Sequence, residues 1–496
     1  MEGVGQATRT VKVPLSKAPR KNTLSIICEA ATSMSRKNAS IVTELGYTST
    51  MYFLYFVISI TILQEALFGF LGLTGTPLFV MRALADQLSI LIFFYAILRN
   101  LSDRIPLTIG GTGYERLFII FFGYSISISI LTTQSNFSTN LAEIIVLNRF
   151  IFLSLTVPMI ANTQIKLEKL LRFVWLMIAL QATIGFIQKI GGIQVIDLFR
   201  PNDYFNVMTG SERSFTSNRG LNRQMLIGTV GDFITFGYLM FVGIIILLSK
   251  RIFTIKASTL LVCFLALIFF SGSRTIFLSA LLVTAVYLFT KISIRWRLLA
   301  VFSGAAIAPW ILSVIIQMSA GVEFEYSTFL ALFRPEFIES LMQQRLGHAL
   351  LYLPNLVKDP VVIFGLSPDR VFATEYVLKN FGDVLPYVFM TTFIDTLEDF
   401  YPAALITYYG LIGSTLFYAM HFLILRSAWQ DRLHQDPLVA RLARIAVLLI
   451  FSTHILSLGN QSFENRGLSL MLWLSVGMYM SIRIIKRRAT VSARIP

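Results

Sequence analysis

The chain is dominated by apolar runs that are long enough to cross a membrane. Of its 496 residues, 55% are hydrophobic and 42 are phenylalanine, which leaves too little polar surface to cover a soluble globule of this size. A helix needs roughly 20 apolar residues to cross the hydrocarbon core, and runs of this length recur along the sequence. Membrane β-barrels instead show short alternating segments. The sequence therefore predicts an all-α polytopic membrane protein.

Twelve of these runs are expected to be transmembrane helices. They lie at about 51–73, 77–98, 117–133, 141–162, 171–190, 229–249, 255–272, 275–294, 298–317, 402–425, 442–459 and 466–485. The expected organisation is a basic tail at 1–47, nine helices within 48–317 with an outer loop at 191–228, a large loop with short helices at 318–401, three helices within 402–485, and a basic tail at 486–496.

The charges are sorted between the two sides of the membrane. The formal net charge is +15, yet the stretch from Ser319 to Phe400 has eleven acidic and five basic residues. If the N-terminus lies inside, the tails and the loops on that side hold most of the Lys and Arg. The positive-inside rule then places both termini in the cytoplasm and the two long loops outside. Membrane lipids are expected partners, and nucleic acid is not.

Other sequence features restrict the chemistry. The two cysteines, Cys28 and Cys263, lie in the N-terminal tail and in the middle of an apolar run, so no disulfide is expected. The first 47 residues are polar and basic and lack the apolar segment of a cleavable signal. The four histidines and the scattered acidic residues form no convincing metal site. We therefore expect neither a metal nor a cofactor.

Three arginines lie close together in the first long outer loop. Arg213, Arg219 and Arg223 fall within about ten residues, on the side of the membrane that has few basic groups. The guanidinium group suits phosphate oxygens and stays charged at physiological pH. The cluster therefore indicates an anionic partner, although pairing with nearby acids such as Asp232 would also account for it.

Arg274 is placed at the outer membrane boundary by its neighbours. It belongs to Ser271-Gly-Ser-Arg-Thr275, a short polar sequence between two apolar runs. One reading is a residue that extends its charged end to the interface. The other is a second phosphate-binding arginine, which helix packing would bring to the first cluster.

The large loop offers candidates for acid–base chemistry. Arg345 and His348 are three residues apart, so they share one face of a helix that would end at Pro354. Glu398 and Asp399 directly precede the next apolar run. A carboxylate there can cap the helix, or it can act as a general base at the membrane boundary.

Several charged residues fall inside the expected helices. They are Glu65, Asp86, Arg149 and Asp232. Isolated charges are costly in hydrocarbon, so each needs a partner. They would either join helices together or serve a proton- or ion-coupled transporter.

Several of these segments resemble one family when they are taken in order. Arg223 to Leu239, Ser271 to Thr275, the Arg345 helix, Val362 to Pro368 and Glu398 to Gly413 are similar to segments of O-antigen ligases and polymerases. The resemblance covers residues 220–425 approximately, and no single motif in it is specific. It implies a metal-free glycosyltransferase whose donor is a glycan on a polyprenyl pyrophosphate, at the periplasmic face of the bacterial inner membrane.

The resemblance also implies roles for the candidate residues. Arg223 and Arg274, with Arg219 or Arg345, would hold the pyrophosphate, and Asp399, Glu398 or His348 would accept the proton of the incoming hydroxyl. Apart from the resemblance, tyrosines offer rings for sugar stacking and hydroxyls for hydrogen bonds, and the candidates are Tyr204, Tyr326, Tyr352, Tyr387 and Tyr401.

One difference from the ligases favours a polymerase. In ligases a histidine beside an asparagine precedes the helix after the large loop, where this chain has Glu398 and Asp399. That favours a polymerase, which joins lipid-linked repeat units of O-antigen, capsule or exopolysaccharide and could work with a chain-length regulator protein. The alternatives are a ligase that transfers glycan to lipid A core, and a flippase or ion-coupled transporter.

Overall fold

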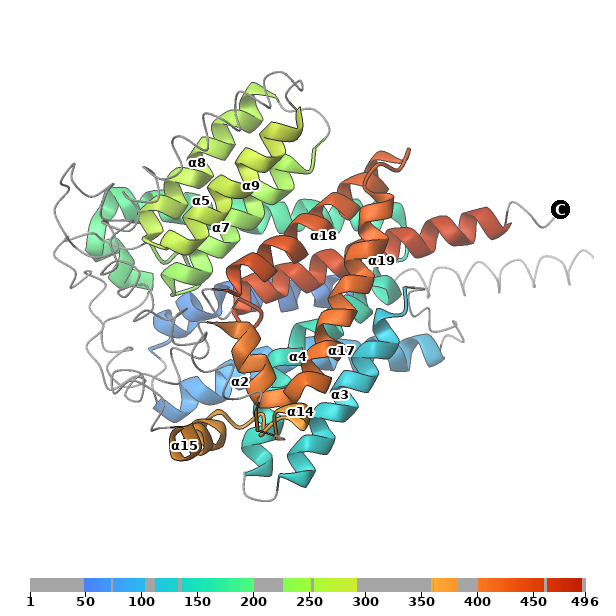
Figure 1. The fold of residues 1–496 in the computed structure, drawn as a ribbon. Coiled ribbons are helices and arrows are strands. Elements are labelled where there is room, and N and C mark those ends of the chain that lie inside the picture. Colours follow the sequence, from blue (N-terminus) through green and yellow to red (C-terminus); the bar gives the residue numbers. More distant parts are fainter. Residues whose placement is uncertain are drawn as a thin grey trace, which may run out of the picture. The chain divides into compact units, whose positions relative to one another are not determined.

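The structure is a computed structural model that describes part of the chain. The described residues are 49–72, 75–102, 112–132, 136–199, 226–250, 254–291, 358–359, 361–381, 400–458 and 462–492. The chain divides into two units, Met1–Thr50 and Met51–Pro496. Only Ser49 and Thr50 of the first unit are described. Every regular element in the described residues is a helix (Figure 1).

Seven helices are long and apolar enough to cross a membrane. They are Ser49–Phe70, α3 (Tyr114–Leu131), α4 (Phe137–Ile160), the Gln164–Gly192 part of α5 (Gln164–Phe199), α17 (Tyr401–Asp431), α18 (Pro437–Leu456) and the Arg466–Thr490 part of α19 (Arg466–Ser492). Shorter apolar helices occur within α2 (Gly75–Ser102), α7 (Phe233–Leu248), α8 (Ile255–Ser271) and α9 (Arg274–Lys291). The prediction of an all-α membrane protein is therefore confirmed.

The finer predictions are tested only in part. Eleven of the twelve predicted membrane helices overlap a described helix, and the one at about 298–317 lies outside the described residues. The number twelve therefore stays a prediction. In the predicted large loop, the described residues include the short helices α14 (Val361–Phe364) and α15 (Arg370–Phe381). The proposed Arg345 helix lies outside the described part.

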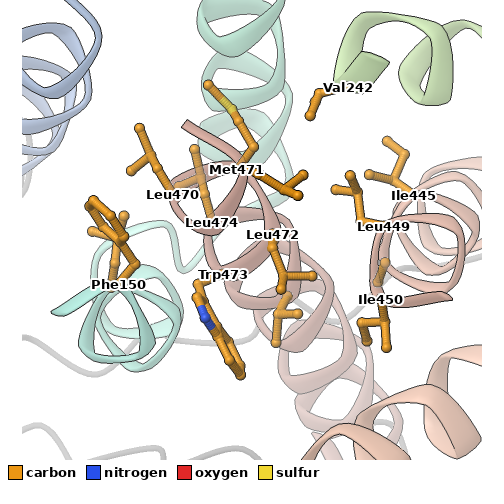
Figure 2. Packing of buried hydrophobic residues seen from close by; sticks show 14 of the residues in the cluster. Phe150, Val242, Ile445, Leu449, Ile450, Leu470, Met471, Leu472, Trp473 and Leu474 are labelled. Carbon is orange, nitrogen blue, oxygen red and sulfur yellow. The ribbon is translucent and has the colours of Figure 1, made fainter. Parts of the chain in front are cut away.

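Helix α19 forms much of the core. In its apolar segment 83% of the residues are buried, compared with 39% in α5. It packs against α4, α7 and α18, and Figure 2 shows its side chains between Phe150 of α4 and Ile445 of α18. At Gly477 an added Cβ would lie 2.9 Å from Val157 Cβ, so α19 and α4 approach closely where the residue is small.

The two ends of α19 lie in different surroundings. Near its C-terminal end, Arg483 pairs with Asp431 of α17 and Lys486 pairs with Asp436, the N-cap of α18. Lysines also occur where α5 begins (Lys166 and Lys169) and just after α7 ends (Lys250). We call the end of the helices that contains these residues, Arg483 and Lys486 the basic end. The opposite end of the helices contains the start of α19, and we call it the Arg466 end.

Candidate functional site

A buried turn from Leu226 to Gly231 lies against the first described helix at the Arg466 end. Thr229 donates its Oγ1–H to the carbonyl oxygen of Ile62 (3.3 Å), and the backbone N–H of Ala66 donates to the carbonyl of Thr229 (3.1 Å). In an uninterrupted α-helix these two helix groups pair with each other. Thr229 therefore bridges one helical turn and fixes the position of Gln64 and Glu65, which lie on that turn.

Two glutamines of α5 satisfy the backbone of this buried turn. Gln188 Oε1 accepts from the N–H of Ile227 (3.2 Å) and of Gly228 (2.9 Å), and its Nε2 donates to Gly228 O (2.9 Å). Gln181 Oε1 accepts from Thr229 N (2.9 Å). Neither glutamine is exposed. A buried backbone N–H or C=O group is costly without a hydrogen-bond partner, so these bonds are what allow the turn to be buried.

The N-terminal ends of α7 and α19 contact each other beside this turn. Asp232 caps α7 by accepting from Ile234 N (3.3 Å), Thr235 N (2.8 Å) and Thr235 Oγ1 (2.7 Å). Asn465 accepts from the N–H groups of Gly467 and Leu468 at the start of α19 and donates to Thr235 Oγ1 (2.9 Å). One chain of hydrogen bonds therefore joins the two helix starts.

Arg466 and Glu65 form an ion pair between α19 and the first helix. Arg466 Nη1 lies 3.3 Å from Glu65 Oε1. With the amide of Gln64 turned so that its oxygen faces the guanidinium group, Gln64 accepts from Arg466 Nη1 and Nε. The charges are largely withdrawn from solvent, because the side chains of Arg466 and Glu65 are 22% and 9% exposed.

These groups surround a cavity of about 250 Å³. Its lining combines hydrogen-bonding and charged side chains with two aliphatic residues. The polar residues are Thr61, Gln64, Glu65, Asp232, Thr235 and Arg466, and the aliphatic ones are Ile62 and Val230. The described part of the lining thus presents two carboxylates, one guanidinium group, one amide and two hydroxyls to a ligand.

A second charged cluster surrounds Glu464, which is two residues before Arg466 in the chain. Arg370, the first residue of α15, donates from Nε to Glu143 of α4 (3.0 Å) and from Nη2 to Glu464. Arg149 Nη2 donates to the backbone carbonyl of Glu464 (3.2 Å). Segment 464–466 is therefore held on one side by two arginines and on the other by Glu65 and Thr235.

The residues before α15 are docked onto three helices. Tyr124 of α3 donates to Phe364 O (2.8 Å), Leu366 N donates to Thr407 O of α17 (2.9 Å), and Asn140 of α4 accepts from Asp369 N (2.8 Å). Together with the Arg370 ion pairs, these bonds connect part of the predicted large loop to the segment that holds Arg466.

Most of the predicted site residues lie outside the described residues. These are Arg219, Arg223, Arg345, His348, Glu398 and Asp399. Arg274 begins α9, and its side chain is not described. The turn before it lies against α7, because a Cβ added at Gly237 would be 3.2 Å from Ser271 Oγ. The turns at 228–232 and 271–274 therefore both flank the N-terminal half of α7, and convergence of the arginines stays a prediction.

Other expectations can be compared directly with the structure. Tyr401 does not face a sugar-binding surface: it is 2% exposed and its ring packs near Phe417 and Phe463. The N-cap of α17 is Phe400, which makes no side-chain capping bond. The intramembrane charges Glu65 and Arg149 both join their helices to the 464–466 segment.

Arg466, Gln64, Glu143, Arg370 and Glu464 were not predicted as site residues. One signal was available for Arg466. A basic residue at a helix N-terminus is unfavourable next to the positive end of the helix dipole, so an arginine directly before a long apolar run indicates a special partner. No comparable signal exists for Gln64, because polar residues near helix ends are common.

The comparisons with known proteins add no family. No family model matches the chain, and no curated protein matches it. Among the residues that the structure describes, no group of three or more His, Cys, Asp or Glu side chains is placed to hold a metal ion.

Proposed function

We propose that the chain is a membrane glycosyltransferase that polymerises oligosaccharide units carried on polyprenyl pyrophosphate. The observation that carries this proposal is the position of the turn from Gly228 to Asp232. This turn belongs to the segment that resembles O-antigen polymerases, and in the structure it borders the cavity together with Arg466 and Glu65. The segment that carries the resemblance thus supplies two residues of the cavity lining, Val230 and Asp232.

The charge distribution supports a periplasmic site. The basic end of the described helices has the Lys and Arg excess that is typical of cytoplasmic loops, and the cavity lies at the other end. If the basic end is cytoplasmic, the cavity opens at the outer boundary of the bacterial inner membrane, where lipid-linked glycans are expected for this family.

In the proposed reaction, a hydroxyl oxygen of the acceptor glycan attacks C1 of the donor sugar. The bond between C1 and the pyrophosphate oxygen breaks, and polyprenyl pyrophosphate leaves with the electron pair. Arg223 and Arg274, with Arg219 or Arg345, hold this leaving group, where donors that meet developing charge are most effective. Asp399, Glu398 or His348 accepts the hydroxyl proton.

The test uses the full-length protein in lipid vesicles supplied with a lipid-linked oligosaccharide. The proposal predicts a ladder of longer products on the lipid carrier. Arg223→Ala and Arg274→Ala should each lower the rate by about 10²- to 10³-fold, whereas Arg432→Ala at the basic end should leave it unchanged. Absence of lengthening by the wild-type protein, or full activity in both arginine variants, would overturn the proposal.

A transporter is the second candidate, because the cavity contains the carboxylates of Glu65 and Asp232. Such groups bind cations or protons in many transporters. The same vesicles separate the two functions. A transporter would move the lipid-linked oligosaccharide across the bilayer without changing its length, and this movement would depend on a proton or sodium gradient.

A further inference from the structure

We infer that the cavity beside Arg466 binds one neutral sugar residue of the glycan rather than the pyrophosphate. This inference rests on the proposed function and names the part of the substrate that the cavity receives. It assigns roles to Gln64, Glu65 and Arg466, none of which belongs to the predicted pyrophosphate-binding set.

The charge of the lining argues against pyrophosphate. Among the described lining residues, Glu65 and Asp232 contribute two carboxylates and Arg466 contributes one guanidinium group, so this part of the lining is formally negative. The helix starts do not compensate, because N–H groups at the beginning of α7 and α19 already donate to the caps Asp232 and Asn465. A dianion placed here would face two carboxylates at short range.

The existing bonds also argue against a metal cation. Glu65 is paired with Arg466 at 3.3 Å, so a cation would lie next to a fixed positive charge. Asp232 Oδ2 already accepts from both the N–H and the hydroxyl of Thr235. Neither carboxylate therefore offers the open set of oxygen ligands that a hard cation requires.

A sugar fits the chemistry of the same groups. Its hydroxyls both donate and accept, so they can bond to carboxylates, a guanidinium group and an amide without bringing net charge. Its C–H groups need an apolar contact, and Ile62 and Val230 supply one. Charged groups that already pair with each other need not separate to accommodate such a ligand.

The size of the cavity limits the ligand to about one ring. Its volume is about 250 Å³, far more than the roughly 10–15 Å³ that one water molecule needs on the same measure. Pockets for drug-sized molecules begin at about 300 Å³. The cavity is thus suited to a monosaccharide unit, and the rest of the glycan would extend out of it.

Two variants test the inference. Gln64→Leu removes the amide at nearly constant size, and Thr61→Val removes a hydroxyl whose bond within the described part of the chain is to Val57 O of its own helix (2.7 Å). The matched control is Thr156→Val, a buried threonine of α4 with the same local bond, to Phe152 O (2.8 Å). Thr61→Val and Thr156→Val should retain the wild-type melting temperature within a few degrees. Gln64→Leu also removes an acceptor from the Arg466 guanidinium group, so it is compared with the wild type at equal amounts of folded protein.

Binding is measured by saturation-transfer NMR on the full-length protein in nanodiscs. The probes are methyl glycosides of glucose, galactose, mannose, rhamnose and N-acetylglucosamine, together with inorganic pyrophosphate and sodium chloride as competitors. We expect at least one glycoside to bind, with an affinity about tenfold weaker in Gln64→Leu and unchanged in Thr156→Val. Pyrophosphate and sodium should not compete.

The outcomes separate the sugar site from the proposed function. Displacement of a bound glycoside by pyrophosphate or sodium would overturn the sugar site. So would a wild-type lengthening rate in both Gln64→Leu and Thr61→Val. Glycoside binding that is lost in Gln64→Leu, in a protein that never lengthens a lipid-linked oligosaccharide, would support the sugar site while the polymerase proposal fails.

Discussion

The two ends of α19 contain similar ion pairs in different surroundings. Arg466 pairs with Glu65 at 3.3 Å and Arg483 pairs with Asp431 at 3.6 Å, and both arginine side chains are 22% exposed. At the basic end Asp431 also accepts from Tyr479 (2.7 Å), in a cluster beside a basic tail. At the Arg466 end the pair borders a cavity. Both ion pairs connect helices. The cavity is therefore the feature that makes the Arg466–Glu65 pair, and not the Arg483–Asp431 pair, part of a candidate site.

Helix electrostatics sharpen the same contrast. Arg466 is the first residue of α19, where the positive end of the helix dipole disfavours a cation, whereas Arg483 precedes the last turn of α19 and lies outside the reach of either end. The dipole therefore places no cost on Arg483. Glu65 and Gln64 compensate the charge of Arg466 at this unfavourable position.

The largest difference is expected when the two arginines are removed separately. Arg466→Ala should lower the rate of glycan lengthening by about 10²-fold, because it displaces the groups that position the substrate. Arg483→Ala should change the rate by no more than about threefold. Both proteins are assayed in vesicles at equal amounts of folded protein, judged by size-exclusion chromatography. Equal losses in the two variants would show that the Arg466 pair is only a joint.

The next effect concerns a backbone contact at the Arg466 end. Gly410 interrupts α17 with φ 68° and ψ −177°, and an added Cβ would lie 2.4 Å from Gly365 N. Gly410→Ala should cost about 3 kcal/mol, because only glycine adopts this conformation readily and the neighbour is backbone. Thermal melting in detergent measures the loss.

Gly123 provides the matched control for this substitution. It lies in the regular helix α3 with open space where a Cβ would be, so Gly123→Ala should be neutral or stabilising by up to about 1 kcal/mol. If the Gly410→Ala protein had the same melting temperature as the wild type, this would contradict the docking of residues 361–369 onto α17.

A smaller loss is expected at the Thr229 bridge. Thr229→Val keeps the shape but removes the hydroxyl that donates to Ile62 O and accepts from Gln181. It should cost about 1–3 kcal/mol, because buried partners lose their bonds. Thr156→Val, near the basic end, removes only a bond within one helix and should cost less. Similar melting temperatures for the two variants would argue against the bridge.

The sequence predicts the described helices well, but it does not predict the residues around the cavity, for physical reasons. Apolar runs of membrane length have few alternative structures, so α4, α7 and α19 begin within a few residues of their predicted starts. Segment 464–466 contacts α4, α7, α15 and the first helix through pairs of residues that are 94 to 401 positions apart in the chain, and no local pattern encodes such pairings. Glycine and aspartate mark the turn at 228–232 in the sequence, but its glutamine partners on α5 resemble ordinary polar residues.

The smallest effect belongs to the basic end and depends on pH. Asp436 caps α18 and lies 2.5 Å from Lys486 Nζ. Burial would raise the pKa of its carboxyl group, but the bonds from Lys486 and from the backbone N–H groups of Val439 and Leu438 outweigh this effect and lower it. The stabilisation is therefore complete above the ordinary pKa of about 4 and is lost as the pH falls through the lowered value.

Because the Asp436 pair is partly exposed, it should contribute no more than about 1 kcal/mol. Asp436→Asn should melt below the wild type at pH 7, and the difference should shrink as the pH is lowered below 4. A constant difference across that range would mean that packing at the helix start, rather than the carboxylate charge, stabilises this joint. In either case glycan lengthening at pH 7 should be unaffected, because this pair lies at the end of α19 away from the cavity.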